Sequence, residues 1–135
     1  MVRVELSRIV IDERRQDQII VLKEVSGPRK FPIMIGILEA SSIKMKVTDV
    51  QMPRPLTHDL LLSTIEGLGA QVQHVLIDDL VEGTFYAKII LKTQDDKEHS
   101  IDARPSDSIA LAVRAGAPIF VADEVIERAS VSSVD

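Results

Sequence analysis

The chain has 135 residues, no cysteine and a formal net charge of −5, with 45% hydrophobic and 27% charged residues. These values fit one globular domain with a substantial core, and the lack of cysteine excludes disulfides and thiolate metal sites. There is no basic excess and the aromatic content is only 3%, which argues against a broad phosphate-binding face and against a base-stacking platform.

No targeting or membrane segment is expected. Arg3 and Glu5 interrupt the first apolar run, so the N-terminus does not resemble a signal peptide. No apolar run approaches the roughly 20 residues needed to span a bilayer. The composition therefore predicts a soluble, cytoplasmic protein without membrane contacts.

Hydrophobic patterning predicts an α+β domain. Strands are expected at 2–12, 18–25, 31–35, 71–80, 85–91, 98–103 and 119–121, and helices at 36–50, from 57 to Gly67 or Gly69, after Pro105, and at 123–128. The first two strands are expected to form a hairpin, with a bulge near Ser7. Hairpin strands with segregated helices indicate a mixed, mostly antiparallel sheet with helices packed on it. We expect a single domain over 1–128 and a frayed C-terminal tail at 129–135.

The first long helix is expected to bury one apolar stripe. Its members, Ala40, Ile43, Val47 and Val50, recur at helical spacing, while Glu39, Ser42 and Lys46 mark its polar side. The sequence Met52-Pro-Arg-Pro then ends the helix, because proline cannot continue it.

The stretch from Asp102 to Arg114 predicts the end of a strand followed by a capped helix. Pro105 pushes Arg104 towards an extended conformation, and Ser106 is a favoured N-cap residue. Asp107 places a negative charge at the positive end of the helix dipole. Ser106 has no companion base or glycine elbow in its motif, so we do not expect it to be a nucleophile.

The stretch from Arg54 to Asp59 repeats this pattern. An Arg-Pro pair again precedes a hydroxyl cap residue, Thr57, and an early aspartate, here preceded by His58. Two similar helix starts in one small domain suggest two neighbouring corners. Free N–H groups at a helix start and an adjacent arginine form an anion site, so a phosphodiester could bind at Arg54 or Arg104.

Four motifs make the chain resemble a known family. They are Pro32-Ile-Met-Ile-Gly-Ile-Leu-Glu-Ala, Arg54-Pro-Leu-Thr-His-Asp-Leu-Leu, Gly83-Thr-Phe-Tyr-Ala and Arg104-Pro-Ser-Asp-Ser-Ile-Ala-Leu-Ala, in that order. Together they resemble the bifunctional nuclease family, formerly a domain of unknown function, over nearly the whole chain. The resemblance implies the same α+β class, a homodimer, and a nuclease that hydrolyses DNA and RNA.

Residue chemistry suggests how such a nuclease would work. Metal-assisted phosphodiester hydrolysis uses carboxylates to hold Mg²⁺ or Mn²⁺, which activates water. The candidate ligands are Glu39, Asp59 and Asp107. His58 would serve as general base beside the two aspartates. The candidate phosphate-binding residues are Arg54, Thr57, Arg104 and Ser106. No glycine-rich phosphate loop or Rossmann fingerprint is present in the sequence, so no organic cofactor is expected.

Other interpretations remain open from the sequence. Arg54 and Arg104 could simply form ion pairs with Asp59, Asp107 or Glu39, and the motifs could be ordinary helix caps. The chain could also be a non-catalytic module that binds a small anionic ligand or a protein partner at the same corner, or a structural dimer. A purely structural role predicts that Arg104 and Asp107 are paired and buried, with no adjoining pocket.

Overall fold

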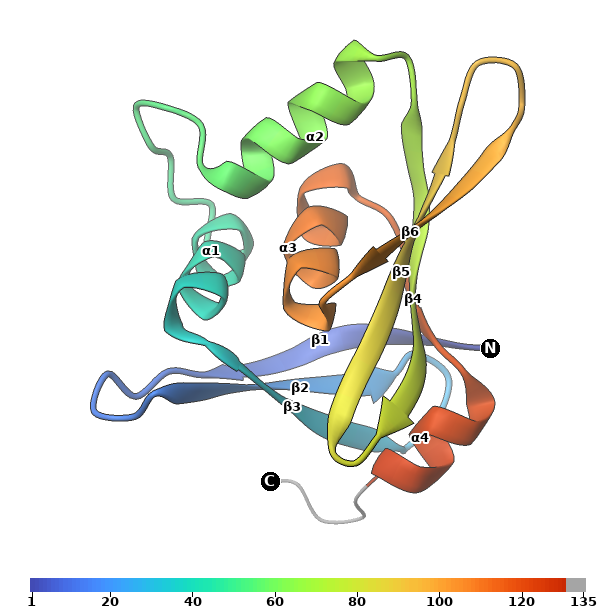
Figure 1. Ribbon diagram of the computed structural model, residues 1–135. Coiled ribbons are helices and arrows are strands. Elements are labelled where there is room, and N and C mark those ends of the chain that lie inside the picture. Colours follow the sequence, from blue (N-terminus) through green and yellow to red (C-terminus); the bar gives the residue numbers. More distant parts are fainter. Residues whose placement is uncertain (131–135) are drawn as a thin grey trace.

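The fold is built on one seven-stranded sheet and four helices, seen in a computed structural model that describes residues 1–130 (Figure 1). The strands are β1 (Val2–Val10), β2 (Asp17–Glu24), β3 (Lys30–Gly36), β4 (Gln71–Val81), β5 (Thr84–Lys92), β6 (Glu98–Ala103) and β7 (Ile119–Val121). The helices are α1 (Ile37–Val47), α2 (Thr57–Gly67), α3 (Pro105–Ala115) and α4 (Asp123–Ala129).

The sheet is mixed and strongly curled. Its strand order is β3-β2-β1-β7-β4-β5-β6, in which β4 and β7 run parallel and the other neighbours antiparallel. Phe31 on β3 and Phe85 on β5 lie near opposite edges in this order, yet their ring centroids are only 5.7 Å apart. The sheet therefore curls round until its two ends approach each other (Figure 1).

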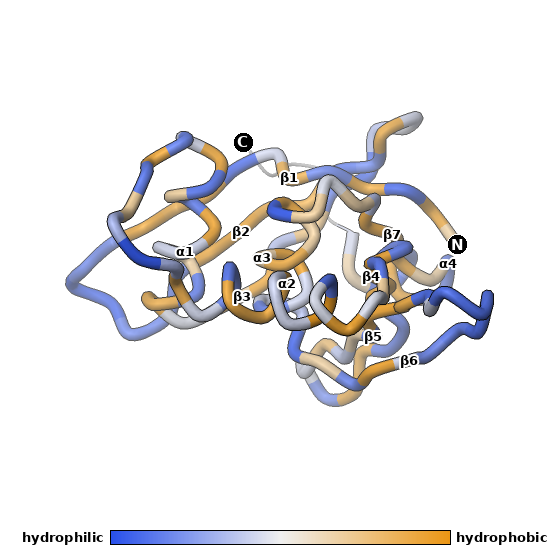
Figure 2. Tube along the Cα trace, turned by 90° about the horizontal axis from the view of Figure 1, so that it is seen from above, coloured by the Kyte–Doolittle hydropathy of each residue, from blue (hydrophilic) through white to orange (hydrophobic). Residues whose placement is uncertain are grey.

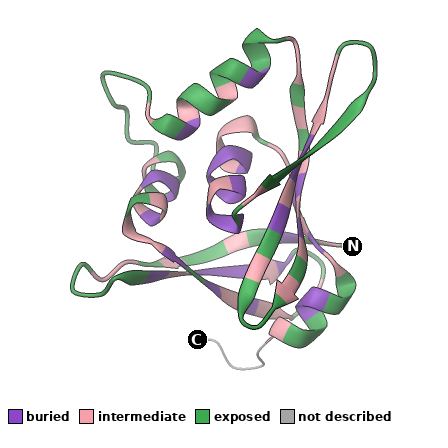
Figure 3. Cartoon of the chain, viewed as in Figure 1, coloured by how far each residue is buried: buried purple, intermediate pink, exposed green. Residues whose placement is uncertain are grey.

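Helices α1, α2 and α3 lie inside the curl. Helix α3 returns the chain from β6 to β7 and contacts α1, α2, β4 and β5. Its buried face includes Ile109 and Leu111, which are fully enclosed, whereas α2 is exposed on its outer side (Figure 3). The loops of the β1–β2 and β5–β6 hairpins, at the periphery, are polar (Figure 2). Helix α3 is thus the central support on which functional side chains can be fixed.

The expected α+β class, the mostly antiparallel sheet and the first hairpin are confirmed. The bulge expected near Ser7 is present, because the β1–β2 register shifts between Leu6 and Arg8. The buried stripe of α1 is shorter than expected. Ala40 and Ile43 are fully buried, but α1 ends at Val47, which is 54% exposed, and Val50 is 52% exposed.

The early end of α1 has a local cause. Asp49 adopts a left-handed backbone conformation with φ 57°, which a continuing helix cannot contain. The N–H of Val50 then donates to the carbonyl of Met45 and closes the turn. At the other end of the chain, α4 includes Ala129, and residues 131–135 of the expected tail lie outside the described part. No helix within residues 1–130 is long and apolar enough to cross a membrane.

Candidate functional site

Helix α3 begins two residues earlier than a cap at Ser106 would place it. Arg104 is the N-cap, with φ −70° and ψ 146°, and Pro105 occupies the first helical position, where its missing N–H costs nothing. The expected Ser106 cap is therefore wrong: Ser106 lies within the first turn and is buried. Ser108 Oγ instead donates to the Arg104 carbonyl at 2.9 Å, which ties the start of the helix together.

Helix α2 is closed at its start by Asp59 and not by Thr57. Thr57 is the first helical residue, it is exposed, and no side-chain cap forms at Leu56 before it. The Leu56 N–H donates to Asp59 Oδ2 at 2.9 Å. The expected Thr57 cap is therefore also wrong, since the carboxylate three residues further on reaches back to perform that task.

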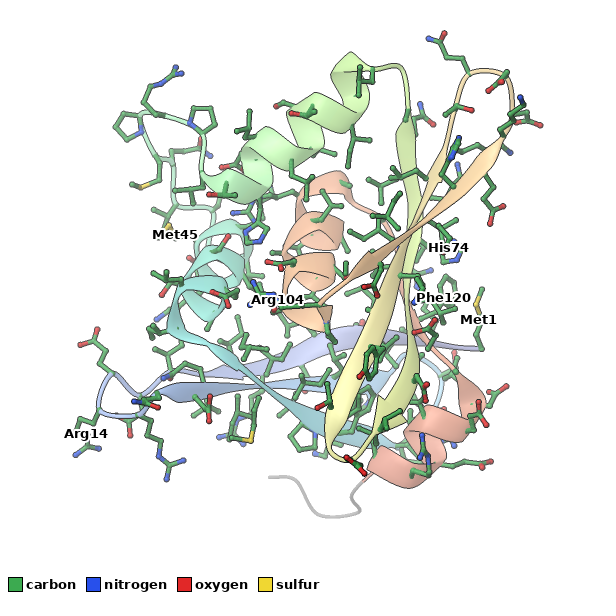
Figure 4. All side chains as sticks on the ribbon, in the orientation of Figure 1. Met1, Arg14, Met45, His74, Arg104 and Phe120 are labelled. Atoms are coloured by element: carbon green, nitrogen blue, oxygen red, sulfur yellow. The ribbon has the colours of Figure 1, made fainter. Side chains whose placement is uncertain are left out.

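The two helix starts meet directly, as their similarity suggested. His58 Nε2 lies 2.8 Å from Asp107 Oδ1. The other Asp107 oxygen, Oδ2, accepts from Arg104 Nε at 2.8 Å, and Arg104 Nη1 reaches Glu39 Oε1 on α1 at 3.2 Å. Arg104 lies between α1 and α3 (Figure 4). One row of hydrogen bonds therefore joins three helices.

The row continues inward through Ser42 to a buried arginine. Ser42 Oγ lies 2.7 Å from His58 Nδ1, and Arg114 Nη2 donates to the same oxygen at 3.0 Å. Arg114 also donates from Nε to Asp59 Oδ1 at 2.7 Å. Because Arg114 can only donate, the Ser42 hydroxyl proton is free to point at Nδ1. We therefore assign neutral His58 the tautomer with its proton on Nε2, donated to Asp107.

The hydrogen bonds determine the charge of both aspartates. Burial opposes ionisation of Asp107, but hydrogen bonds from Arg104 and His58 outweigh it and lower the pKa of this carboxyl. Burial likewise opposes ionisation of Asp59, and the Leu56 N–H and Arg114 outweigh it and lower its pKa. Asp107 in turn raises the pKa of Arg104. At neutral pH the row thus contains two ionised aspartates, each paired with an arginine.

The outer end of the row opens into a pocket of about 450 Å³. Glu39, Arg104 and Ser106 are among its polar lining residues, and Met34 and Phe85 are among its apolar ones. The Arg104 side chain is 65% exposed and Glu39 is 17% exposed. Arg104 and Asp107 are therefore paired, but they are not buried away from a pocket, so the arrangement expected for a purely structural role is not what the protein has.

The remaining candidate residues lie elsewhere. Arg54 and Asp59 line a separate pocket of about 360 Å³ beside the α1–α2 loop, together with Lys46 and Arg114. Arg54 is exposed and forms no ion pair within residues 1–130. Arg104 and Arg54 thus do not converge on one phosphate. The carboxylates predicted to share a metal are also divided, since Glu39 and Asp107 hold Arg104 whereas Asp59 holds Arg114.

The metal prediction needs a smaller set of ligands than the sequence suggested. Within the described residues, no group of three or more His, Cys, Asp or Glu side chains is arranged to hold a metal ion. The trio of Glu39, Asp59 and Asp107 therefore does not fit one ion. The pair of Glu39 and Asp107 does face a shared cation, namely the Arg104 guanidinium.

Two residues of the row were not among the sequence candidates. In the sequence, Arg114 only marked the end of the stretch from Asp102, and Ser42 was placed on the polar side of α1. The Arg114 side chain is in fact only 3% exposed. The sequence signal for these partners was the pair of aspartates in the first turns of α2 and α3, because each of them requires a positively charged partner. Arg54 is closer to Asp59 in sequence than Arg114 is, so Arg54 was considered as its partner and Arg114 was not.

The comparisons with known proteins indicate one protein family. A model of the bifunctional nuclease domain matches residues 20–134. An uncharacterised protein of Mycobacterium tuberculosis is 41% identical over 129 residues, which cover 96% of this chain and 76% of that protein. The match spans all the residues of the row described above.

Plant proteins named as nucleases are more distant relatives. Bifunctional nuclease 2 of Arabidopsis thaliana is 31% identical over 105 residues, which cover 76% of this chain and 32% of that protein. Bifunctional nuclease 1 of Oryza sativa subsp. japonica is 30% identical over 106 residues, with 76% and 32% covered. The similar region is thus about one third of each plant protein.

Proposed function

We propose that this chain, which belongs to the bifunctional nuclease domain family, hydrolyses phosphodiester bonds of DNA or RNA at the corner formed by α1 and α3. One observation carries the proposal: the exposed Arg104 is held between Glu39 and Asp107 at the rim of a pocket. An arginine in this position can bind two oxygens of one phosphate. Carboxylates beside it can accept a proton or bind a cation.

The role of each residue follows from its access to the pocket. Arg104 would bind the phosphate through its guanidinium N–H groups. Glu39 would accept the proton of a water molecule whose oxygen attacks phosphorus. The bond from phosphorus to the leaving oxygen then breaks, and that oxygen takes a proton from solvent. His58 has both ring nitrogens engaged, so we assign it to holding Asp107 in place instead of activating water.

A divalent ion fits the proposal with two protein ligands instead of three. Mg²⁺ is usually held by one or two carboxylates together with substrate phosphate oxygens and water. Glu39 and Asp107 would hold such an ion, or Mn²⁺, once a substrate has drawn Arg104 towards its phosphate. When bound, the ion would neutralise charge that develops on the phosphate. Asp59 has no part in this pair, because it lies with Arg114 at the other pocket.

A second candidate function uses the same corner without catalysis. Glu39 and Asp107 are both already paired with Arg104, and the chain carries a net charge of −5. These observations favour a module that binds one small anionic ligand, or an acidic segment of a protein partner, through Arg104. Such a module would retain ligand in the presence of a chelator and would leave phosphodiesters intact.

The experiment is cleavage of single-stranded RNA and plasmid DNA by highly purified protein, with Mg²⁺, Mn²⁺ or a chelator. We expect cleavage to need a divalent ion and to fall about 100-fold or more in Arg104→Ala and in Glu39→Gln. Arg14→Ala is the matched control, because Arg14 is 90% exposed in the β1–β2 hairpin and does not line the pocket. Arg54→Ala tests the other corner and should retain activity.

The outcomes separate the two candidate functions. Equal cleavage by the native protein and by a folded Arg104→Ala variant would mean a contaminant or a site elsewhere, and the proposal would fail. No cleavage under any condition, together with anion binding that depends on Arg104, would support the binding module. Circular dichroism of each variant confirms that the comparison is made between folded proteins.

A further inference from the structure

The pocket beside Arg104 is lined by both polar and apolar residues. Its polar lining includes Glu39, Arg104 and Thr84. The apolar lining residues, here called the apolar wall, include Met34 and Ile35 from β3 and Phe85 from β5. Met34 is 65% exposed although it is a large apolar side chain, and Phe85 is half-buried. The curl of the sheet brings β3 towards β5, so that residues of both strands line the pocket (Figure 1).

The size of the pocket restricts what can enter. About 450 Å³ lies within the range of pockets that hold one small organic molecule. One nucleotide unit, with its phosphate on Arg104 and its base on the apolar wall, is a ligand of this class. A base that is paired and stacked in a duplex cannot reach such a wall, because its faces are covered by its neighbours.

The charge of the pocket also favours an unpaired nucleotide over a duplex. Among the described residues that line this pocket, Arg104 is the one cation, and Asp17 and Glu39 are acids. Tight duplex binding depends on neutralising many phosphates with lysine and arginine, which a chain of net charge −5 does not offer here. Contacts of an unpaired base with apolar and aromatic side chains do not need that positive charge.

From these observations we infer that the substrate class of this site is single-stranded nucleic acid, bound through one unpaired nucleotide whose base lies against the apolar wall at Met34 and whose phosphate meets Arg104. The inference rests on the proposed function for the identity of the reacting bond. The contact between the base and Met34 depends only on binding of the nucleotide, whether or not a bond is then cleaved. Met34 is thereby a specificity-determining residue: it favours unpaired nucleotides and contacts no reacting atom.

The test measures binding and cleavage separately. Binding uses fluorescein-labelled single-stranded DNA of about 12 nucleotides, or its blunt duplex, with a chelator present so that a divalent ion contributes nothing. We expect the single strand to bind at least about tenfold more tightly than the duplex, and Met34→Ala to weaken single-strand binding about three- to tenfold. Leu38→Ala is the matched control, because Leu38 is 78% exposed on neighbouring α1 and does not line the pocket.

Cleavage of the same two DNAs with Mn²⁺ then distinguishes this inference from the proposed function. The inference and the proposed function are both supported if the single strand is cleaved preferentially and Met34→Ala raises KM for it without changing kcat. Equal binding and equal cleavage of duplex and single strand would overturn the inference and leave the nuclease intact. Single-strand binding that depends on Met34 without any cleavage would support the inference and overturn the proposed nuclease. An unchanged affinity in Met34→Ala would also overturn the inference.

Discussion

His58 Nε2 and Asp107 Oδ1, 49 residues apart in sequence, lie 2.8 Å from each other and join the starts of α2 and α3. The contact is largely shielded from water, since the side chains of His58 and Asp107 are 11% and 29% exposed. A hydrogen bond to a charged group in such surroundings is stronger than one at the surface. The pair therefore serves to hold Asp107 as well as to pack two helices.

The first prediction is that His58→Ala destabilises the fold by about 2–3 kcal/mol, because it leaves Ser42 Oγ and Asp107 Oδ1 without their partner and opens a cavity. Urea denaturation followed by circular dichroism measures this free energy of unfolding. His74→Ala serves as the control histidine, since its ring makes an edge contact with Phe120 outside the row. If the urea midpoint of His58→Ala equals that of the native protein, the contact contributes nothing to stability.

The second prediction concerns the two arginines near Asp59. Arg114→Met removes donors to Asp59, Ala110 and Ser42 from a side chain that is only 3% exposed. We expect it to lower the free energy of unfolding by about 2–4 kcal/mol, because it leaves buried acceptors unpaired. Arg54→Met, at an exposed position, should change it by less than about 0.5 kcal/mol. Similar losses in the two variants would contradict the assignment of Arg114 as the buried partner.

The sequence allowed most of the fold to be predicted, because strand alternation and helix periodicity are local signals. The α+β class followed from such patterns. The similarity of the two Arg-Pro corners suggested that they are neighbours, but only the packed helices show the contact between them. The partners of Asp59 and His58 could not be predicted. Arg114 and Ser42 reach them only after α1, α2 and α3 have packed together, and their own neighbours in sequence indicate ordinary helix positions. The caps were misjudged because Asp59 performs the task expected of Thr57, and because α3 already begins at Pro105, which places Ser106 inside the first turn.

The third prediction tests whether Gly36 leaves room for the Glu39 carboxylate. A Cβ atom at position 36 would lie 2.8 Å from Glu39 Oε1, closer than such atoms normally approach. Gly36→Ala should therefore push Glu39 away from Arg104 and lower cleavage several-fold, while the free energy of unfolding changes by less than about 1 kcal/mol. Adding Glu39→Gln to this variant should cost less activity than it does alone.

Gly67→Ala provides the matched control for that experiment. A Cβ atom at Gly67 would have no atom within 4 Å, so the substitution should leave cleavage unchanged. An additive loss in the double variant of Gly36 and Glu39 would show that the two positions act independently. The proposed role of Gly36 would then be wrong.

The fourth prediction concerns acid stability. The pKa values of Asp59 and Asp107 are lowered in the folded protein, against the opposing effect of burial, by hydrogen bonds from Leu56 and Arg114 to the first and from Arg104 and His58 to the second. An unfolded aspartate titrates near ~3.9. The unfolded chain therefore binds more protons in acid, so the stability that these pairs supply is complete above about pH 4 and is lost as pH falls through the lower folded values.

Urea midpoints measured from about pH 6 to about pH 2.5 test this dependence. We expect Asp59→Asn to be less stable than the native protein at about pH 6 and the difference to shrink below about pH 4, because the asparagine side chain has no proton to gain. Asp17→Asn is the control, since Asp17 is exposed and forms no ion pair within residues 1–130; its difference should stay small throughout. A difference for Asp59→Asn that is constant with pH would show that the Arg114 pair does not depend on the charge of Asp59.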